Sequence, residues 1–142
     1  MADFGMQLLD VGKVLAALTQ VSAKVDIADQ ELVTRVGHMV ERAAKGNFEG
    51  SHGRGQPHVG GNKPNVVSGT ARRSIYPDPV THSADGYKTQ VGPRVVYGRA
   101  LEFGNPRNGS RPFPYFTPAV DTVREKVPAI AAAIYGAATT IH

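Results

Sequence analysis

The sequence predicts an α+β fold in which a long N-terminal helix and a C-terminal helix pack on a small antiparallel sheet. An apolar stripe over residues 6–46, a hairpin signal at Asp85-Gly86 and a second apolar stripe after Ala119 all favour this class. The chain of 142 residues is long enough for one domain. Its expected sections are a helix over 1–46, a long Gly-rich loop over 47–67, and a compact sheet with the last helix over 68–142.

The first helix carries small or apolar residues at every third or fourth position. These residues are Leu15, Leu18, Val21, Val25, Ala28, Leu32, Val36, Met39 and Ala43. Lys45 and Gly46 predict where the helix ends. One continuous helix is the prediction, with a kink or break near Asp26 as the alternative. A helix of about 35 residues would span roughly 50 Å. Because this exceeds the size of a compact domain, part of it should project toward a partner.

Residues 47–67 are rich in glycine and contain few side chains that could be buried. A loop of this length in a small domain is either functional or disordered. We interpret it as a mobile loop that a neighbouring molecule orders. It is not a phosphate-binding loop, because no Ser or Thr follows Lys63 and Pro64 opposes a following helix. His52 and His58 lack a third ligand at a useful spacing, so neither a metal nor a cofactor is expected.

The compact half begins with a helical turn at residues 68–74, for which Ser68 is the expected N-cap. Strands follow over residues 75–82 and 87–91, and Asp85-Gly86 should form the turn between them. Two prolines should shorten the first strand or confine it to an edge, namely Pro77 and Pro79. A further short strand is expected at Val95 and Val96.

Residues 97–104 are expected to form a two-turn helix that ends at a left-handed glycine. Residues 111–119 should start as extended chain, because each proline forces the preceding residue out of helical geometry. Thr117 is the expected N-cap of the last helix, with Pro118 at its first position. Pro128 lies inside that helix and should kink or split it.

Aromatic residues gather between Tyr76 and Phe116, and the tertiary core is expected there with Phe113 in it. Glu102 has two interpretations. It pairs with Arg99 on the surface of the short helix, or it faces another arginine within the chain or across a subunit boundary. The candidates for that second role are Arg72, Arg73 and Arg111.

The formal net charge is +4 at pH 7, and most of the excess lies in residues 68–142, largely as arginine. Sequence-independent binding of nucleic acid is one interpretation, and a solvated or subunit-facing surface is the other. The absence of cysteine excludes disulfides and thiolate metal sites. No apolar run approaches the roughly 18 residues of a membrane span, and the start lacks the basic region of a signal peptide. We therefore expect cytosolic folding and no membrane partner. No motif points to a catalytic site, so an enzyme is not expected.

Three segments have an order and spacing that resemble the neck or tail-component family of long-tailed bacteriophages, the small proteins that join head and tail. They are Ser68-Gly69-Thr70-Ala71-Arg72-Arg73-Ser74-Ile75, Tyr97-Gly98-Arg99-Ala100-Leu101-Glu102-Phe103-Gly104 and Arg111-Pro112-Phe113-Pro114-Tyr115-Phe116-Thr117-Pro118-Ala119. Ala71 and Gly98 depart from the family pattern, which has leucine and alanine there. An extra residue before Pro118 and the interruption at Pro128 also depart from it.

The resemblance implies a structural protein of the virion, without catalysis or cofactor. Such a protein would form a ring, expected to be a hexamer, between the capsid connector and the tail tube, after assembly begins in the host cytoplasm. Its partners would be further copies of itself, the adjacent head-closure and tail-tube or tail-terminator proteins, and DNA passing through the channel. The residues expected at subunit or partner interfaces are Arg72, Arg73, Tyr97, Arg99, Glu102, Phe103, Arg111, Phe113 and Phe116.

Overall fold

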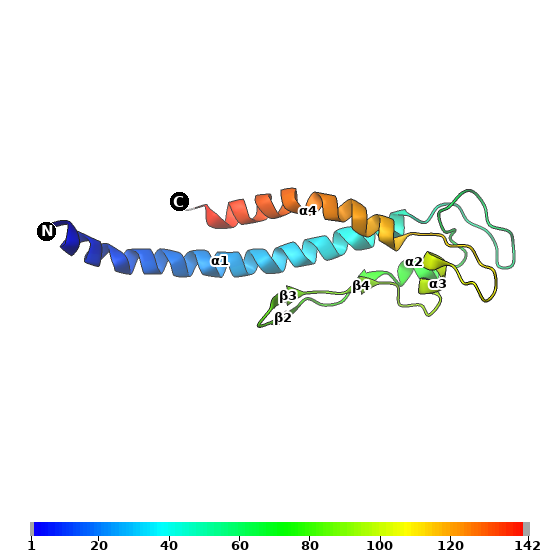
Figure 1. Cartoon of the computed structure of the whole chain (residues 1–142), viewed down its shortest axis with the longest axis horizontal. Helices are drawn as coiled ribbons and strands as arrows, with labels where there is room; N and C mark the ends of the chain where they lie inside the picture. The colour runs from blue at the N-terminus through cyan, green and yellow to red at the C-terminus, as the bar shows by residue number, and fades with distance from the viewer. Residues whose placement is uncertain (1, 141–142) are drawn as a thin grey trace.

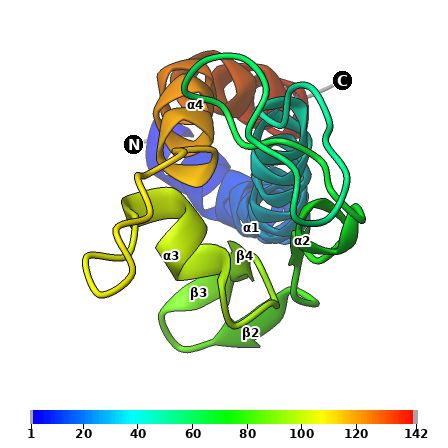
Figure 2. The same ribbon diagram turned by 90° about the vertical axis from the view of Figure 1, so that its right-hand side faces the viewer.

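Two antiparallel helices and a narrow β ribbon make up the molecule, which a computed structural model describes for the backbone of residues 2–140 and the side chains of residues 13–140. Helix α1 (Ala2–Gly46) and helix α4 (Phe116–Thr139) pack along each other. The ribbon lies along a different side of α1, and two short helices stand near one end (Figure 1; Figure 2). The predicted α+β class is confirmed.

Helix α1 is continuous through Asp26, so the break considered there is absent, and it ends at Gly46 as predicted. Its 45 residues span about 68 Å, whereas the 24 residues of α4 span about 36 Å. Tyr135, near the end of α4, donates a hydrogen bond from its hydroxyl to the carboxylate of Asp29. The N-terminal part of α1 therefore extends beyond α4 (Figure 1).

The most tightly packed part of the core lies where both long helices meet the compact half of the chain. Ala44, Ile75, Tyr115 and Ala119 are buried there, and Phe48, Leu101 and Phe116 pack around them. Tyr115, not Phe113, is the central aromatic residue, and Phe113 is only half-buried. Further buried residues line the two long helices, namely Ala28, Val40, Val123 and Ile134.

The β ribbon consists of two short antiparallel pairs. Strand β1 (Tyr76–Pro77) pairs with β4 (Val91–Gly92), and β2 (Thr81–Ser83) pairs with β3 (Gly86–Lys88). Pro79 lies between β1 and β2, where its missing N–H breaks the predicted single strand in two. The hairpin turn is one residue earlier than predicted, because Ser83 pairs with Gly86. The ribbon can lie close to α1 because Gly37 has no side chain: an added Cβ would be 3.2 Å from Thr89 Cγ2.

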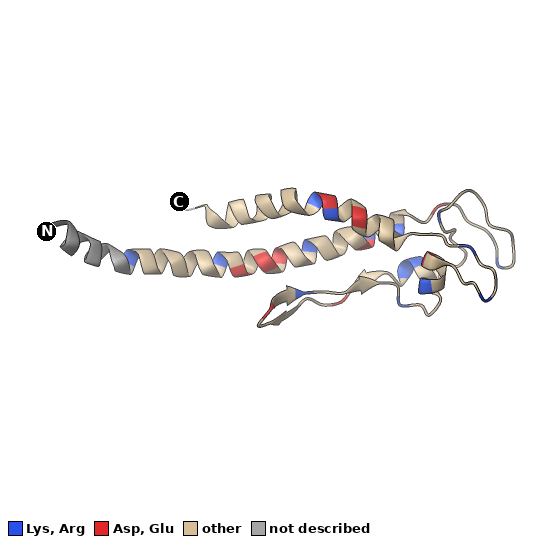
Figure 3. Cartoon of the chain, in the orientation of Figure 1, with Lys and Arg blue, Asp and Glu red and all other residues tan. Residues whose placement is uncertain are grey.

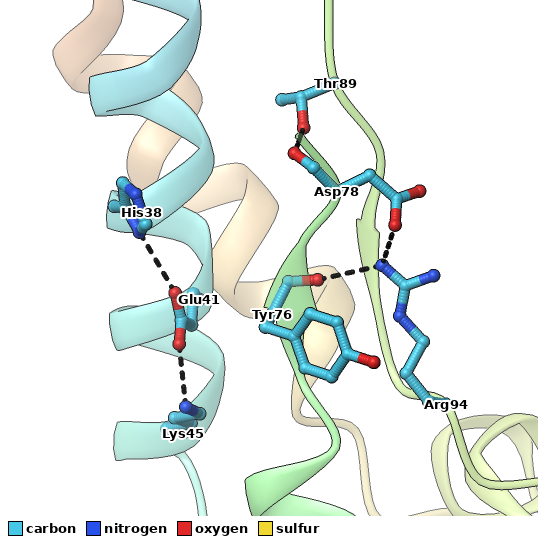
Figure 4. Close-up of polar contacts among 7 residues, drawn as sticks. All are labelled: His38, Glu41, Lys45, Tyr76, Asp78, Thr89 and Arg94. Carbon is cyan, nitrogen blue, oxygen red and sulfur yellow. Dashed lines mark hydrogen bonds and ion pairs between the residues drawn. The ribbon is translucent and has the colours of Figure 1, made fainter. Parts of the chain in front are cut away.

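Polar contacts tie the strands to one another (Figure 4). The guanidinium of Arg94 bonds the carboxylate of Asp78 at 2.8 Å and donates to the carbonyl of Tyr76 at 3.1 Å. The hydroxyl of Thr89 donates to the carbonyl of Asp78 at 2.6 Å. Arg94 is therefore engaged within the chain.

On α1, Glu41 accepts a hydrogen bond from Lys45 at 2.7 Å, which is the main reason why the pKa of Glu41 lies below its ordinary value.

Three local predictions about the compact half are wrong. Helix α2 (Thr70–Arg73) begins after Gly69, whose φ of +78° suits glycine, and Ser68 is not its N-cap. No strand forms at Val95 and Val96, because the chain turns there into α3 (Gly98–Phe103), leaving Val96 99% exposed. Helix α4 begins at Phe116, so neither Thr117 nor Pro118 holds its predicted position.

Pro128 does not split α4, which runs without interruption to Thr139. No helix among the described residues is long and apolar enough to cross a membrane.

The Gly-rich loop folds back on itself around Asn65. The side-chain amide of Asn65 donates to the carbonyls of Glu49 at 2.6 Å and Val59 at 2.8 Å, and its oxygen accepts the Val59 N–H. Pro64 is buried beside it, and the ring of His58 stacks on Phe113 with centroids 4.1 Å apart. These contacts give the loop a defined path, and its mobility stays a prediction.

Replacing Ile75 with alanine should lower the free energy of unfolding by about 2–5 kcal/mol, because the side chain is fully buried and leaves a cavity. Urea denaturation followed by circular dichroism measures this change. Val96→Ala is the control: that side chain is almost fully exposed, so its effect should stay within about 0.5 kcal/mol. Equal effects of the two substitutions would place the core elsewhere.

Candidate functional site

Glu102 is the one buried charged side chain in the described part of the chain, with 6% of its surface exposed. Its Oε2 atom accepts hydrogen bonds from the backbone N–H groups of Tyr115 at 2.8 Å and Phe116 at 2.9 Å. Its Oε1 atom accepts the N–H of Thr117 at 2.9 Å. The N-cap residue of α4 makes no side-chain cap of its own. Glu102 therefore satisfies the free donors at the positive end of that helix.

The predicted pairing of Glu102 with Arg99 or with another arginine of the same chain is wrong, whereas a partner across a subunit boundary stays a prediction. Within the described residues it forms no ion pair, because both oxygens are occupied by backbone donors. The guanidinium of Arg99 instead lies 5.8 Å from the ring centroid of Phe103. Arg111 lies over the ring of Phe113 and donates to the carbonyl of Gly61 at 3.1 Å.

Glu102 and Tyr115 differ in how their ionisation responds to this packing. Burial by itself raises the pKa of Glu102, but hydrogen bonds from Phe116, Thr117 and Tyr115 outweigh it and hold the pKa below its ordinary value. Burial, together with the charge of Glu102, raises the pKa of the Tyr115 hydroxyl to about 12. At neutral pH the carboxylate is thus charged, and the hydroxyl keeps the proton that it donates to the carbonyl of Gly98 at 3.0 Å.

Close packing around Tyr115 fixes α3 against the start of α4. The ring of Tyr115 lies 5.1 Å from that of Phe48, and Asn47 donates to the Tyr115 carbonyl at 2.8 Å. Gly98 leaves room for this contact, because a Cβ there would lie 2.7 Å from Cγ of Pro93 and 3.2 Å from the Tyr115 hydroxyl. The inner side of α3 is therefore held in place, and its outer side is presented to solvent.

The outer side of α3 and the chain beside it form an exposed surface rich in large apolar residues and arginine. We call it the α3 surface, and it consists of Val67, Arg72, Arg73, Val96, Tyr97, Arg99 and Phe103. Phe103 is 66% exposed, and Tyr97 about half. A cleft of about 110 Å³ lies between Tyr97, Val67 and Arg72. Exposed aromatic side chains beside arginine are typical of protein–protein interfaces.

Three of the predicted interface residues lie away from the α3 surface. Arg111 and Phe113 contact the Gly-rich loop through Gly61 and His58. Phe116 is half-buried and lines an apolar groove between α1, the ribbon and α4. The structure thus exposes Arg72, Arg73, Tyr97, Arg99 and Phe103 on one surface, whereas Glu102 is buried within α3 and the other three residues contact the loop or line the groove.

The projecting part of α1 is a second exposed apolar surface. Val14, Leu15 and Leu18 are each more than half exposed. They continue the stripe that packs on α4 farther along the helix, but no element of the described chain covers them. The apolar stripe predicted a helix and a projection, but periodicity alone could not locate where the covering helix stops.

The buried polar side chains of the described residues are all engaged in hydrogen bonds. Glu102 is fully engaged, no buried side-chain polar atom among these residues lacks a partner, and no cluster of three or more possible metal ligands occurs among them. Comparisons with protein-family models, with curated proteins and with solved structures found no match.

Glu102→Gln should lower the free energy of unfolding at pH 7 by about 1.5–3 kcal/mol, the usual worth of hydrogen bonds to a charged group. Because the folded pKa is lowered, the carboxylate contributes stability above its ordinary pKa of 4.5 and loses it as the pH falls through the folded value. Urea denaturation from pH 7 to pH 3 should therefore show the difference from the natural chain shrinking toward acid pH.

The matched control is Glu125→Gln, the same change on the exposed face of α4. It should leave both the stability and its dependence on pH nearly unchanged. A constant difference between the natural chain and Glu102→Gln across this pH range would contradict the assignment of the carboxylate as the cap of α4.

Proposed function

We propose that this chain is a structural protein of the joint between head and tail in a long-tailed bacteriophage, where copies of it assemble as a ring. The observation that carries the proposal is the pair of exposed apolar surfaces, one on the projecting part of α1 and one around α3. A chain that worked alone would leave both in water. Contiguous exposed apolar patches in soluble proteins mark sites of association.

The position of the two surfaces favours a ring. They lie near opposite ends of an elongated molecule and differ in composition (Figure 1). Two separate contact surfaces let each copy meet two neighbours, and repeating such contacts around an axis generates a closed ring when the rotation per copy allows. A stable ring would require each contact to bury well over about 1,000 Å².

The resemblance to the neck or tail-component family adds support from inside the fold. Its second segment, residues 97–104, contains Glu102, and its third, residues 111–119, supplies the N–H groups that Glu102 binds. The two segments thus form one structural unit. Their shared spacing is what that unit requires, so the resemblance concerns residues with a physical role.

The charge distribution fits neighbours in such a joint. Arg72, Arg73 and Arg99 lie on the two short helices at one end of the molecule (Figure 3). In a ring, this end would face an adjoining head-closure, tail-tube or tail-terminator protein, or the DNA in the channel. Arginine suits both partners, because its planar guanidinium binds carboxylate and phosphate alike.

Mass measurement of the purified protein and of assembled particles tests the ring. We expect one multiple of the chain mass, six copies by the resemblance, at the head–tail junction. Phe103→Ala should weaken assembly by about tenfold or more, because an exposed aromatic anchor is lost, while the free energy of unfolding changes by less than about 0.5 kcal/mol.

Val59→Ala is the control for Phe103→Ala, because Val59 is also an exposed apolar residue but lies in the Gly-rich loop. It should assemble like the natural chain. A protein that stays monomeric at high concentration and is missing from particles would overturn the proposal.

Sequence-independent binding of nucleic acid is the alternative function, and one observation favours it. His38, Arg42, Lys45 and Arg72 line a hollow of about 490 Å³ beside α1, with Glu41 as its acidic member. A phosphate could enter there. Binding to duplex DNA should then fall steeply with salt, with a slope set by the phosphates contacted. Arg42→Ala should reduce that slope, and no affinity for duplex at low salt would remove this alternative.

A further inference from the structure

An apolar trough runs beside the middle of α1. Its floor is formed by Val33, Val36 and Val40, and its walls by Tyr87 and Val91 of the ribbon and Val120 of α4. It has a volume of about 460 Å³ and is open to solvent. Figure 2, which looks along the helices, shows α1, the ribbon and α4 arranged around this region. The lining is mostly apolar, so water is a poor occupant.

The chain also carries a helical segment that lacks a partner. We call residues 13–21 of α1 the arm. Its exposed side chains Val14 and Leu18, with the half-buried Val21, lie on the same face of α1 as the floor of the trough. The arm and the trough are therefore two apolar surfaces on one face of one helix, and each is incomplete.

The arm cannot fill the trough of its own chain. Leu18 and Val36 are separated by about 27 Å along a helix that has no break between them. A straight helix cannot fold back on itself, so any helix that covers the trough comes from another molecule. Every copy of this chain brings one arm and one trough, which makes a second copy the partner that leaves neither surface exposed.

The spacing of the side chains supports this pairing. Along the arm, Val14, Leu18 and Val21 are separated by four and then three residues. Along the trough floor read backwards, Val40, Val36 and Val33 have the same separations. Both rows span about 10 Å. Two antiparallel helices with matching rows of this kind interdigitate their side chains, with Leu18 opposite Val36.

We propose that the arm of one copy lies antiparallel in the trough of a second copy, with Leu18 packed against Val36. This contact rests on the proposed function, because it assumes that copies of the chain assemble. It would give α1 a cover along both of its incompletely packed sections. Association would bury the arm and exclude water from the trough at the same time.

Disulfide cross-linking tests the contact directly, because the natural chain has no cysteine. Leu18→Cys and Val36→Cys chains with tags of different mass are mixed and mildly oxidised. A disulfide requires Cβ atoms about 3.5–4.5 Å apart, so only a close contact reacts efficiently. We expect the mixed disulfide at a several-fold higher yield than with Val96→Cys, whose side chain is exposed far from the arm. If the Val36→Cys chain does not fold, Val21→Cys with Val33→Cys replaces the pair, because these two positions lie opposite each other in the same register.

Two results would overturn the contact: mixed product no higher than with Val96→Cys, or arms linked mainly to arms through Leu18→Cys pairs. A chain that carries both cysteines separates this contact from the ring. The antiparallel register that places Leu18 opposite Val36 also places Val36 of the first copy opposite Leu18 of the second, so this chain should form doubly linked pairs of copies. Ring-sized particles that release such linked pairs on denaturation support both the contact and the ring. Linked pairs without ring-sized particles support the contact and overturn the ring, whereas ring-sized particles without cross-links overturn only the contact.

A pair of charge substitutions gives an independent measurement. Leu18→Asp places a carboxylate in the apolar trough, so self-association measured by analytical ultracentrifugation should weaken by about tenfold or more. Ile27→Asp is the matched control, because Ile27 is 64% exposed and lies on the opposite face of the same helix. Equal weakening by both would contradict the contact.

Discussion

The carboxylate of Glu102 at the start of α4 is the interaction on which the compact half depends. A helix begins with backbone N–H groups that have no partner within the helix. The N-cap residue of α4 is Tyr115, whose side chain does not accept a hydrogen bond from them. Glu102 supplies the missing acceptor from α3 and binds three of these donors. Its charge is placed at the positive end of the helix, where the dipole favours it and where water cannot compete. Together with the hydrogen bond from the Tyr115 hydroxyl to Gly98, this contact fixes α3 relative to the start of α4.

The same contact decides which residues face outward. Because Glu102 and Leu101 point toward the core, Tyr97, Arg99 and Phe103 remain exposed on α3. Gly98 belongs to this arrangement: the alanine of the resembling family would not fit here, since a Cβ would meet the ring of Pro93. The departure from the family pattern therefore has a local cause in the packing of this chain.

The sequence predicted the elements that depend on periodicity. It did not predict side-chain contacts whose partners are backbone groups far along the chain. The stripes of α1 and α4 repeat over many turns, so both helices and the end at Gly46 could be predicted. Glu102 could not, because its three-residue separation from Arg99 suggests a local ion pair, while its actual partners are N–H groups 13–15 residues later that any residue type would offer. The strand predicted at Val95 and Val96 is absent for a similar reason. Strand propensity is a local property, and it does not show that the chain must turn into α3 there.

The length of α1 poses an energetic problem that a single chain does not solve. Isolated helical turns are marginal in water, and most helix stability in proteins comes from packing of the apolar face. In the arm that face is exposed, although it continues without change the stripe that is buried farther along. Leu15 and Leu18 are each 58% exposed, so each forgoes part of the roughly 1.5–3 kcal/mol that fully burying a leucine side chain would gain. That gain becomes available only when a second molecule covers the arm. In the proposed assembly the projecting turns and their cover would form together, and association would order this part of the helix.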